Sequence, residues 1–95
     1  MTVEARPPAV LMKRDEIVNL KRAADYAGRS VDTVRRWAHD FGIGRQAGPS
    51  APLEISVVAL EMVLHGDFPA LEDLRAGNRE SPLVKRYLDF LGIDA

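Results

Sequence analysis

Apolar residues recur with a helical period from residue 21 onward, and the first segment with this period, residues 21–27, predicts a short helix. Asn19 lies close enough to cap this short helix. Gly28 follows it, and glycine readily takes the left-handed conformation that a tight turn between helices needs. One side of the predicted helix carries three alanines: Ala23, Ala24 and Ala27.

A second helix is predicted directly after the turn. Ser30 is a natural N-cap, and Asp32 in the first turn suits the positive end of the helix dipole. At 100° per residue, Asp32, Arg36 and His39 share one side, with Arg35 on its flank. The opposite side is an apolar stripe at i, i+3, i+4 and i+7: Val34, Trp37, Ala38 and Phe41. The pattern therefore predicts a helix that buries Trp37 and presents arginine to solvent.

The segment after this helix, residues 43–55, contains two short extended pieces around a turn. Gly42 and Gly44 end the helix, and Pro49 and Pro52 restrict the turn to a few shapes. We expect a β-hairpin with a loop of about five residues.

Three further helices are predicted beyond the hairpin. Ser56 caps residues 57–64, which are apolar almost all round and are therefore expected to be mostly buried. Residues 69–77 and 81–92 each have a proline near the start and a glycine at the end. The last helix has a broad apolar face that either closes the core or meets another copy: Leu83, Val84, Tyr87, Leu88, Phe90 and Leu91.

The N-terminal part is harder to interpret. Residues 1–9 contain a Pro-Pro pair and no periodicity, and the period does not decide between strand and extended lead-in for residues 10–20. We expect residues 1–17 to form a flexible arm, residues 18–66 a folded unit, and residues 67–95 a helical extension that packs on the core or on a neighbouring copy. The fold class is mainly α with a small β-hairpin.

Composition narrows the function classes. The 95 residues are 46% apolar and 28% charged, which is typical of one globular domain. The absence of cysteine excludes disulfides, thiolate metal sites and cysteine nucleophiles. His39 and His65 are too few and too far apart to suggest a metal site, so we expect no metal and no cofactor. No apolar run is long enough for a membrane span and no signal-peptide pattern is present, which favours a cytoplasmic protein without a membrane partner.

The net charge of −1 conceals an uneven distribution. Residues 20–46 hold six basic and three acidic side chains, a net of +3, whereas residues 47–95 hold four basic and eight acidic ones, a net of −4. A basic block of this kind attracts polyanions.

Two short helices joined by a glycine turn, the second one presenting arginine, predict a helix-turn-helix. An α-helix fits the major groove of B-DNA, where arginine bonds guanine bidentately, and the amide groups at the N-terminus near Ser30 suit a phosphate. The hairpin, with Arg45 and Gln46 near its tip, has the shape of a wing along the minor groove.

The run LKRAADYAGRSVDTVRRWAHDFGIGRQ, followed by the hairpin and the helix ISVVALEMVLHGD, resembles the winged helix-turn-helix of the MerR-like superfamily. Within that superfamily it is similar to the small excisionases of phages and integrative elements. The resemblance covers residues 18–66 and rests on the AA pair, the Gly-x-Ser turn and the TVRRW of the recognition helix. It implies DNA contacts by Ser30, Thr33, Arg35 and Arg36.

The chain departs from the family pattern at the turn. Arg29 stands where an apolar residue is common, and Val31 stands where a polar one is common. Either the turn is rotated slightly, or Arg29 contacts a phosphate and Val31 touches a thymine methyl. The long dimerisation helix of MerR-type regulators has no counterpart here, which favours a small architectural or regulatory binder.

Two sets of residues follow from pattern and resemblance together. The expected DNA-contacting residues are Arg29, Ser30, Val31, Asp32, Thr33, Arg35, Arg36, His39, Arg45 and Gln46. The expected structural core of the motif is Ala24, Ala27, Gly28, Val34, Trp37 and Phe41.

The leading hypothesis is an excisionase-like directionality factor that binds adjacent sites on double-stranded DNA cooperatively, bends the DNA and assists a tyrosine recombinase. Head-to-tail contact between the basic face and the acidic tail would align copies along DNA, placing the protein on the nucleoid. A small transcriptional regulator and the DNA-binding subunit of a phage packaging machine are alternatives, as is a protein-interaction adaptor that has lost DNA binding.

We expect no enzymatic activity, because no catalytic set stands out. The carboxylates of the acidic half fall at predicted helix caps and exposed positions, where solvation explains them: Glu54, Glu61, Asp67, Glu72 and Asp73.

Overall fold

A computed structural model describes residues 6–93 of the chain. The described part is mainly helical with a small antiparallel sheet, which confirms the expectation of a mainly α fold with a small β component. A 3-10 turn at Arg14–Glu16 comes first. The remaining elements, in chain order, are β1 (Ile17–Asn19), α1 (Leu20–Ala27), α2 (Val31–Phe41), β2 (Gly44–Arg45), β3 (Glu54–Ser56), α3 (Val57–Leu64), α4 (Phe68–Arg75) and α5 (Pro82–Leu91).

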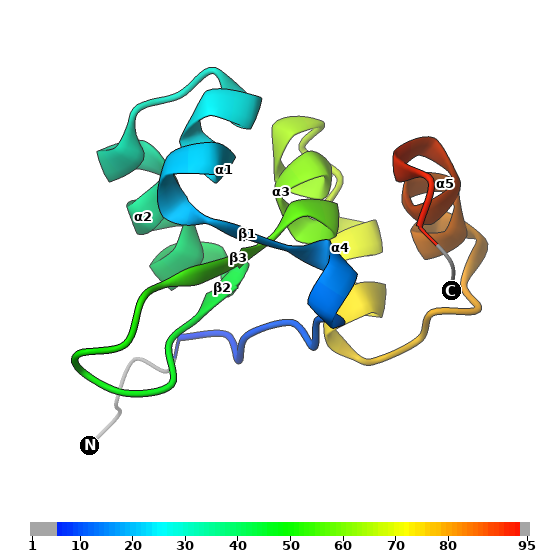
Figure 1. The fold of residues 1–95 in the computed structure, drawn as a ribbon. Coiled ribbons are helices and arrows are strands. Elements are labelled where there is room, and N and C mark those ends of the chain that lie inside the picture. The colour runs from blue at the N-terminus through cyan, green and yellow to red at the C-terminus, as the bar shows by residue number, and fades with distance from the viewer. Residues whose placement is uncertain (1–5, 94–95) are drawn as a thin grey trace.

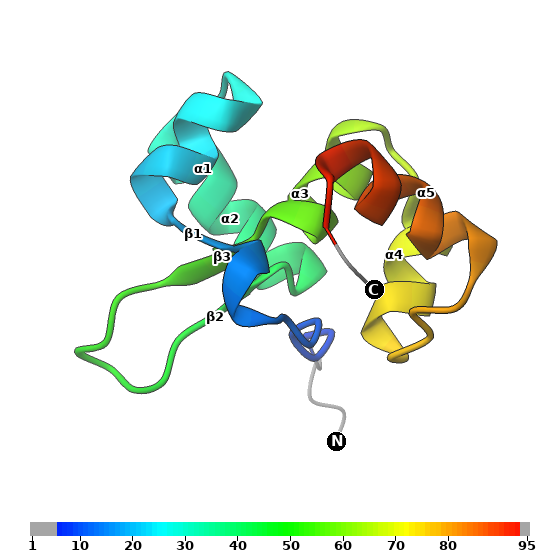
Figure 2. The same cartoon turned by 45° about the vertical axis from the view of Figure 1, so that its right-hand side comes forward.

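Helix α3 lies at the centre of the molecule. It contacts α1 on one side and both α4 and α5 on the other, while α2 packs against α1 (Figure 1). Figure 2 shows α1 and α2 at one end of the molecule and α4 and α5 at the other. Five consecutive residues of α3, Val58–Met62, are buried, which confirms the expectation from its apolar sequence.

The sheet has three strands in the order β1-β3-β2, so β3 is the middle strand. Ile55 of β3 is opposite Val18 on one side and Gly44 on the other, and both pairings are antiparallel. The segment that the period left undecided thus contributes a short edge strand. The loop of residues 46–53 projects from the sheet and is longer than expected, because β2 pairs over two residues only (Figures 1 and 2).

Side-chain caps begin the helices as the sequence indicates. Ser30 Oγ accepts a hydrogen bond from the backbone N–H of Thr33, and Asn19, Ser56 and Ser81 cap α1, α3 and α5 in the same manner. Helix α4 begins at Phe68, one residue before the expected start. Its cap is Asp67, one of the carboxylates that we expected at helix caps and exposed positions.

The expected flexible arm is wrong for residues 10–17; residues 1–5 of that arm lie outside the described part. Val10 and Met12 are buried in the hydrophobic core, and Glu16 is 1% exposed. The backbone N–H of Val10 also donates to the carbonyl of Gly42 over 2.9 Å. The residues that bury this segment are distant in sequence, so its burial could not be predicted from the local sequence pattern.

Glu61 also differs from expectation, because it is 7% exposed instead of solvated. Its carboxylate accepts a hydrogen bond from the Tyr26 hydroxyl at 2.5 Å and lies 2.8 Å from Nε2 of His65. In a similar arrangement, the Tyr87 hydroxyl donates to Asp67 over 2.7 Å. Both tyrosines of the chain thus donate a hydrogen bond to a carboxylate.

We expect both phenols to resist ionisation until strongly alkaline pH. Burial, followed by the hydrogen bond to Glu61, raises the pKa of Tyr26 from 10.0 to about 12. Burial and the hydrogen bond to Asp67 raise the pKa of Tyr87 to about 12 as well. The protonated phenols therefore stabilise the fold fully below pH 10, the ordinary value, and this contribution is lost as the pH rises through 12.

An absorbance titration of tyrosinate on the native protein and in denaturant measures this difference. The variants Tyr26→Phe and Tyr87→Phe each leave one phenol and so assign the two transitions. A native transition that coincides with the denatured one contradicts the prediction.

Candidate nucleic-acid interface

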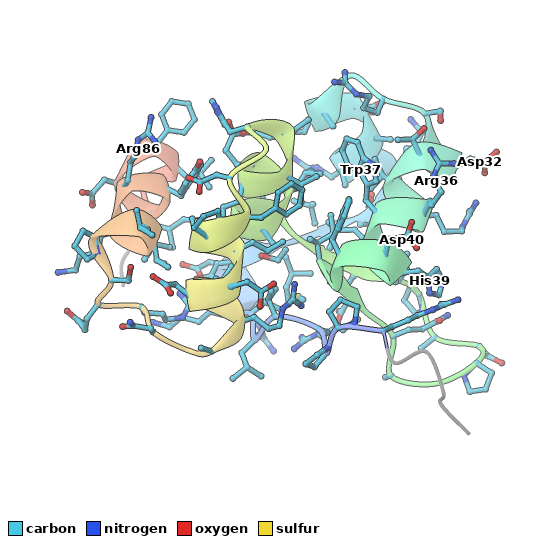
Figure 3. The ribbon with its side chains drawn as sticks, turned by 180° about the vertical axis from the view of Figure 1, so that it is seen from behind. Asp32, Arg36, Trp37, His39, Asp40 and Arg86 are labelled. Carbon is cyan, nitrogen blue, oxygen red and sulfur yellow. The ribbon has the colours of Figure 1, made fainter. Side chains whose placement is uncertain are left out.

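The outer side of α2 carries most of the predicted contact residues. Val34 and Ala38, at 0% and 7% exposure, hold the opposite side of the helix against the core. Figure 3 shows Asp32, Arg36 and His39 on the side of α2 that faces away from the rest of the molecule. The structure thus brings these three side chains together, at the spacing that the helical period predicts.

The N-terminal end of α2 is exposed and is capped by Ser30. Ser30 Oγ accepts from Thr33 N–H at 3.1 Å and donates to Thr33 Oγ1 at 3.0 Å. The first amides of a helix have no partner within the helix, and the dipole makes this end positive. Val31, the first helical residue, is 36% exposed beside them. An anionic oxygen would find backbone donors here.

The two adjacent arginines of α2 differ in their partners. Arg35 Nη1 lies 2.8 Å from Asp32 Oδ1, in a pair whose side chains are 51% and 88% exposed. Such an exposed ion pair contributes little free energy to stability. A phosphate can therefore readily replace Asp32 as the partner of Arg35. Arg36 is exposed, and among residues 6–93 no acidic side chain lies within 4.0 Å of its guanidinium. Arg36 is therefore available to a ligand without breaking an internal ion pair.

Trp37 was expected to be fully buried, but it is only half-buried. It packs against the core with part of its ring exposed, and the guanidinium of Arg29 lies 6.0 Å from the ring centroid. At 100° per residue, Trp37 and Arg35 are on opposite flanks of α2. Arg29 therefore lies on the Trp37 flank of α2, on the opposite side of the helix from Arg35. Phe41 is half-buried too, with its ring 5.3 Å from that of Phe68.

Other members of the expected core are placed as predicted. Ala24, Ala27 and Val34 are buried, and Gly28 takes φ +66° in the turn between α1 and α2. The α1–α2 pair is therefore held together by small side chains and a glycine turn.

The two predicted residues of the hairpin are exposed but engaged within the hairpin itself. Arg45 Nε lies 2.8 Å from Glu54 Oε1 across the strands. Gln46 Nε2 donates to the carbonyl of Ala51 over 2.6 Å and so closes the loop. Because Glu54 offsets the charge of Arg45, this pair adds no net positive charge to the surface.

Arg6 is a basic residue of this surface that the sequence did not indicate. Its Nη1 lies 2.7 Å from Nδ1 of His39, on the outer side of α2. The chain is held in this place because the carbonyl of Pro8 accepts a hydrogen bond from Arg75, which also donates to the carbonyl of Phe41. Arg6 and His39 are 33 residues apart, so only the tertiary structure reveals their contact.

Comparison with known proteins gives no matching family model and no significantly similar curated protein or solved structure. No helix within residues 6–93 combines the length and apolar character needed to cross a membrane.

Proposed function

We propose that residues 18–66 form a winged helix-turn-helix that binds double-stranded DNA through α2. The observation that carries this proposal is the outer side of α2, where Arg36 is exposed without an acidic partner next to a capped, positive helix end. A helix of this size enters the major groove, and arginine is the side chain that reads guanine there.

The remaining contacts follow from this placement. Arg35 joins Arg36 in the groove once a phosphate or a base displaces Asp32. The amides near Ser30 bind the phosphate backbone, and Arg6 and His39 extend the contact toward the C-terminal end of α2. The loop of residues 46–53 serves as the wing over the adjacent minor groove.

We expect Arg36→Ala to weaken DNA binding by about 1–3 kcal/mol, since a direct base or phosphate contact is lost. Random-sequence duplexes are first selected for binding, and the enriched duplex is then titrated by fluorescence anisotropy. Lys85→Ala on α5 is the control, because it removes one positive charge at the other end of the molecule. A phosphate contact by Arg36 reduces the slope of affinity against salt concentration by about one, whereas a base contact relaxes sequence preference.

The DNA-binding proposal fails if the unmutated protein binds no duplex at low salt, and that result supports the adaptor alternative. It also fails if Arg36→Ala and Lys85→Ala weaken binding equally, because the effect is then one of net charge alone.

For the biological role we propose an excisionase-like architectural factor, as the resemblance of the α1–α2 region implies. Binding to circularly permuted fragments measures the DNA bend that this role requires. Excision assays with a neighbouring tyrosine recombinase, set against promoter reporter assays, separate this role from that of a transcriptional regulator.

A further inference from the structure

Helix α5 has an exposed apolar stripe that nothing in residues 6–93 covers. Leu83, Arg86 and Phe90 follow one another at i, i+3 and i+7, so they lie on the same side of the helix. Leu83 is 44% exposed and Phe90 is 71% exposed. The buried side of α5 already contributes Val84 and Leu88 to the core, so Leu83 and Phe90 are apolar side chains that the core does not use.

Beside the stripe is a hollow of about 420 Å³, lined by His65, Arg86, Tyr87, Asp89 and Phe90. Arg86 lies over the Tyr87 ring, 5.7 Å from its centroid, and so borders the hollow in a defined position. The hollow is open to solvent on one side and large enough for an aromatic side chain.

The charges of this surface are of both signs, and within the described part of the chain they form no ion pair. Among the described residues, neither Arg86 nor Asp89 has an oppositely charged side chain within 4.0 Å. Lys85, on another side of α5, does pair with Glu80 at 3.4 Å. Arg86 and Asp89 are three residues apart on the helix. When a second copy of this surface is turned by 180° and placed against the first, each cation faces the anion of the other copy.

We propose that α5 is the interface of a two-fold symmetric homodimer, in which the α5 helices of two copies lie antiparallel. A two-fold axis that passes between the two α5 helices, at the level midway between Arg86 and Asp89, places each arginine opposite the aspartate of the other copy. Phe90 of each copy enters the hollow of the other, and Leu83 faces the last turn of the opposite helix. Every contact then occurs twice, as an isologous interface requires.

The charge pattern favours a second copy over other occupants. A uniformly acidic partner would leave Asp89 facing like charge, and a uniformly basic one would do the same to Arg86. The arrangement differs from the head-to-tail contact that the overall charge asymmetry indicates, because the two-fold contact uses one surface of each copy.

The α5 surface is at the other end of the molecule from the outer side of α2, as the positions of Arg86 and Arg36 in Figure 3 show. Dimerisation therefore leaves the proposed DNA-binding surface free. The dimer does not depend on the proposed function, but if both hold, the DNA site consists of two half-sites related by a two-fold axis.

Sedimentation equilibrium of the full chain without DNA tests the proposal. We expect a concentration-dependent monomer–dimer equilibrium. Phe90→Ala should weaken it about tenfold or more, because Phe90 is the aromatic anchor. Since Phe90 is exposed in the monomer, its replacement should leave the helical circular dichroism and the thermal transition of the monomer unchanged.

Charge reversal gives the sharper test. R86E places two acidic groups opposite each other on both sides of the two-fold axis, and D89R places two basic groups there, so each variant alone should be monomeric. Mixing R86E with D89R makes both contacts attractive again, and the mixture should form a heterodimer. K85E is the matched control, because it makes the same change of charge away from the stripe and should leave the dimer intact.

An unmutated protein that stays monomeric at all concentrations overturns the proposal. A dimer that survives R86E, D89R and Phe90→Ala overturns it as well, because another surface must then be responsible. A mixture of R86E and D89R that remains monomeric excludes the antiparallel two-fold arrangement.

Discussion

Replacement of Arg79 by methionine is expected to destabilise the protein by about 3–5 kcal/mol, because it leaves a buried carboxylate without its cation. Arg79 binds Glu16 bidentately, with Nη1 and Nη2 each 2.7 Å from one carboxylate oxygen. The side chain of Glu16 is 0% exposed and that of Arg79 is 18% exposed. Hydrogen bonding to Glu16 raises the pKa of Arg79, so the guanidinium stays protonated. The expected loss is a large part of the roughly 5–15 kcal/mol that stabilises a typical domain.

Urea denaturation of two further variants shows whether the loss of stability comes from the unpaired buried charge. The double variant Glu16→Leu with Arg79→Met removes both charges and should recover most of the loss, since the uncompensated charge is its cause. Lys85→Met breaks the exposed pair with Glu80 and should cost less than about 1 kcal/mol. If Arg79→Met is as stable as the unmutated protein, Glu16 does not depend on Arg79 in the folded state.

Gly42→Ala is expected to cost about 2–5 kcal/mol, the sum of a left-handed backbone penalty and a steric one. Gly42 ends α2 with φ +65°. A Cβ atom there would lie 2.6 Å from the carbonyl oxygen of Pro8 and 2.5 Å from Nη1 of Arg75. The Pro8 carbonyl is main chain and cannot swing aside, so the N-terminal segment must shift.

Gly28→Ala is the matched control for this variant. Gly28 has φ +66°, almost the same conformation, yet a Cβ atom there meets nothing within 4 Å. It should therefore show the backbone penalty alone, about 1–2 kcal/mol. Equal losses in the two variants, measured by the same denaturation, would mean that the N-terminal segment does not pack tightly on Gly42.

The helices were predictable because their signals are local. Ser30, Ser56 and Ser81 cap helices within three residues of their own position, and Gly28 and Gly92 end helices by adopting positive φ. A propensity that acts over one turn of helix can be read from the sequence without knowledge of the rest of the chain.

The residues whose burial was wrongly predicted depend on how separate segments of the chain pack together. Glu16 is buried because Arg79, 63 residues later, supplies its counter-charge. Glu61 is buried because Tyr26, 35 residues earlier, donates to it. Trp37 lies on the apolar stripe, but the stripe is wider than the surface that covers it, so part of its ring is exposed. Exposure of a stripe depends on what packs against it, and periodicity carries no such information.

Local signals along the chain set where the helices begin and end and which side chains of α2 face outward, because caps, glycines and the 3.6-residue period act within a few residues. Local signals do not reveal that the segment around Val10 joins the core, that Arg6 reaches His39, or that Leu83 and Phe90 are exposed. Those outcomes depend on packing between distant segments, where burial and charge pairing are settled by the whole fold.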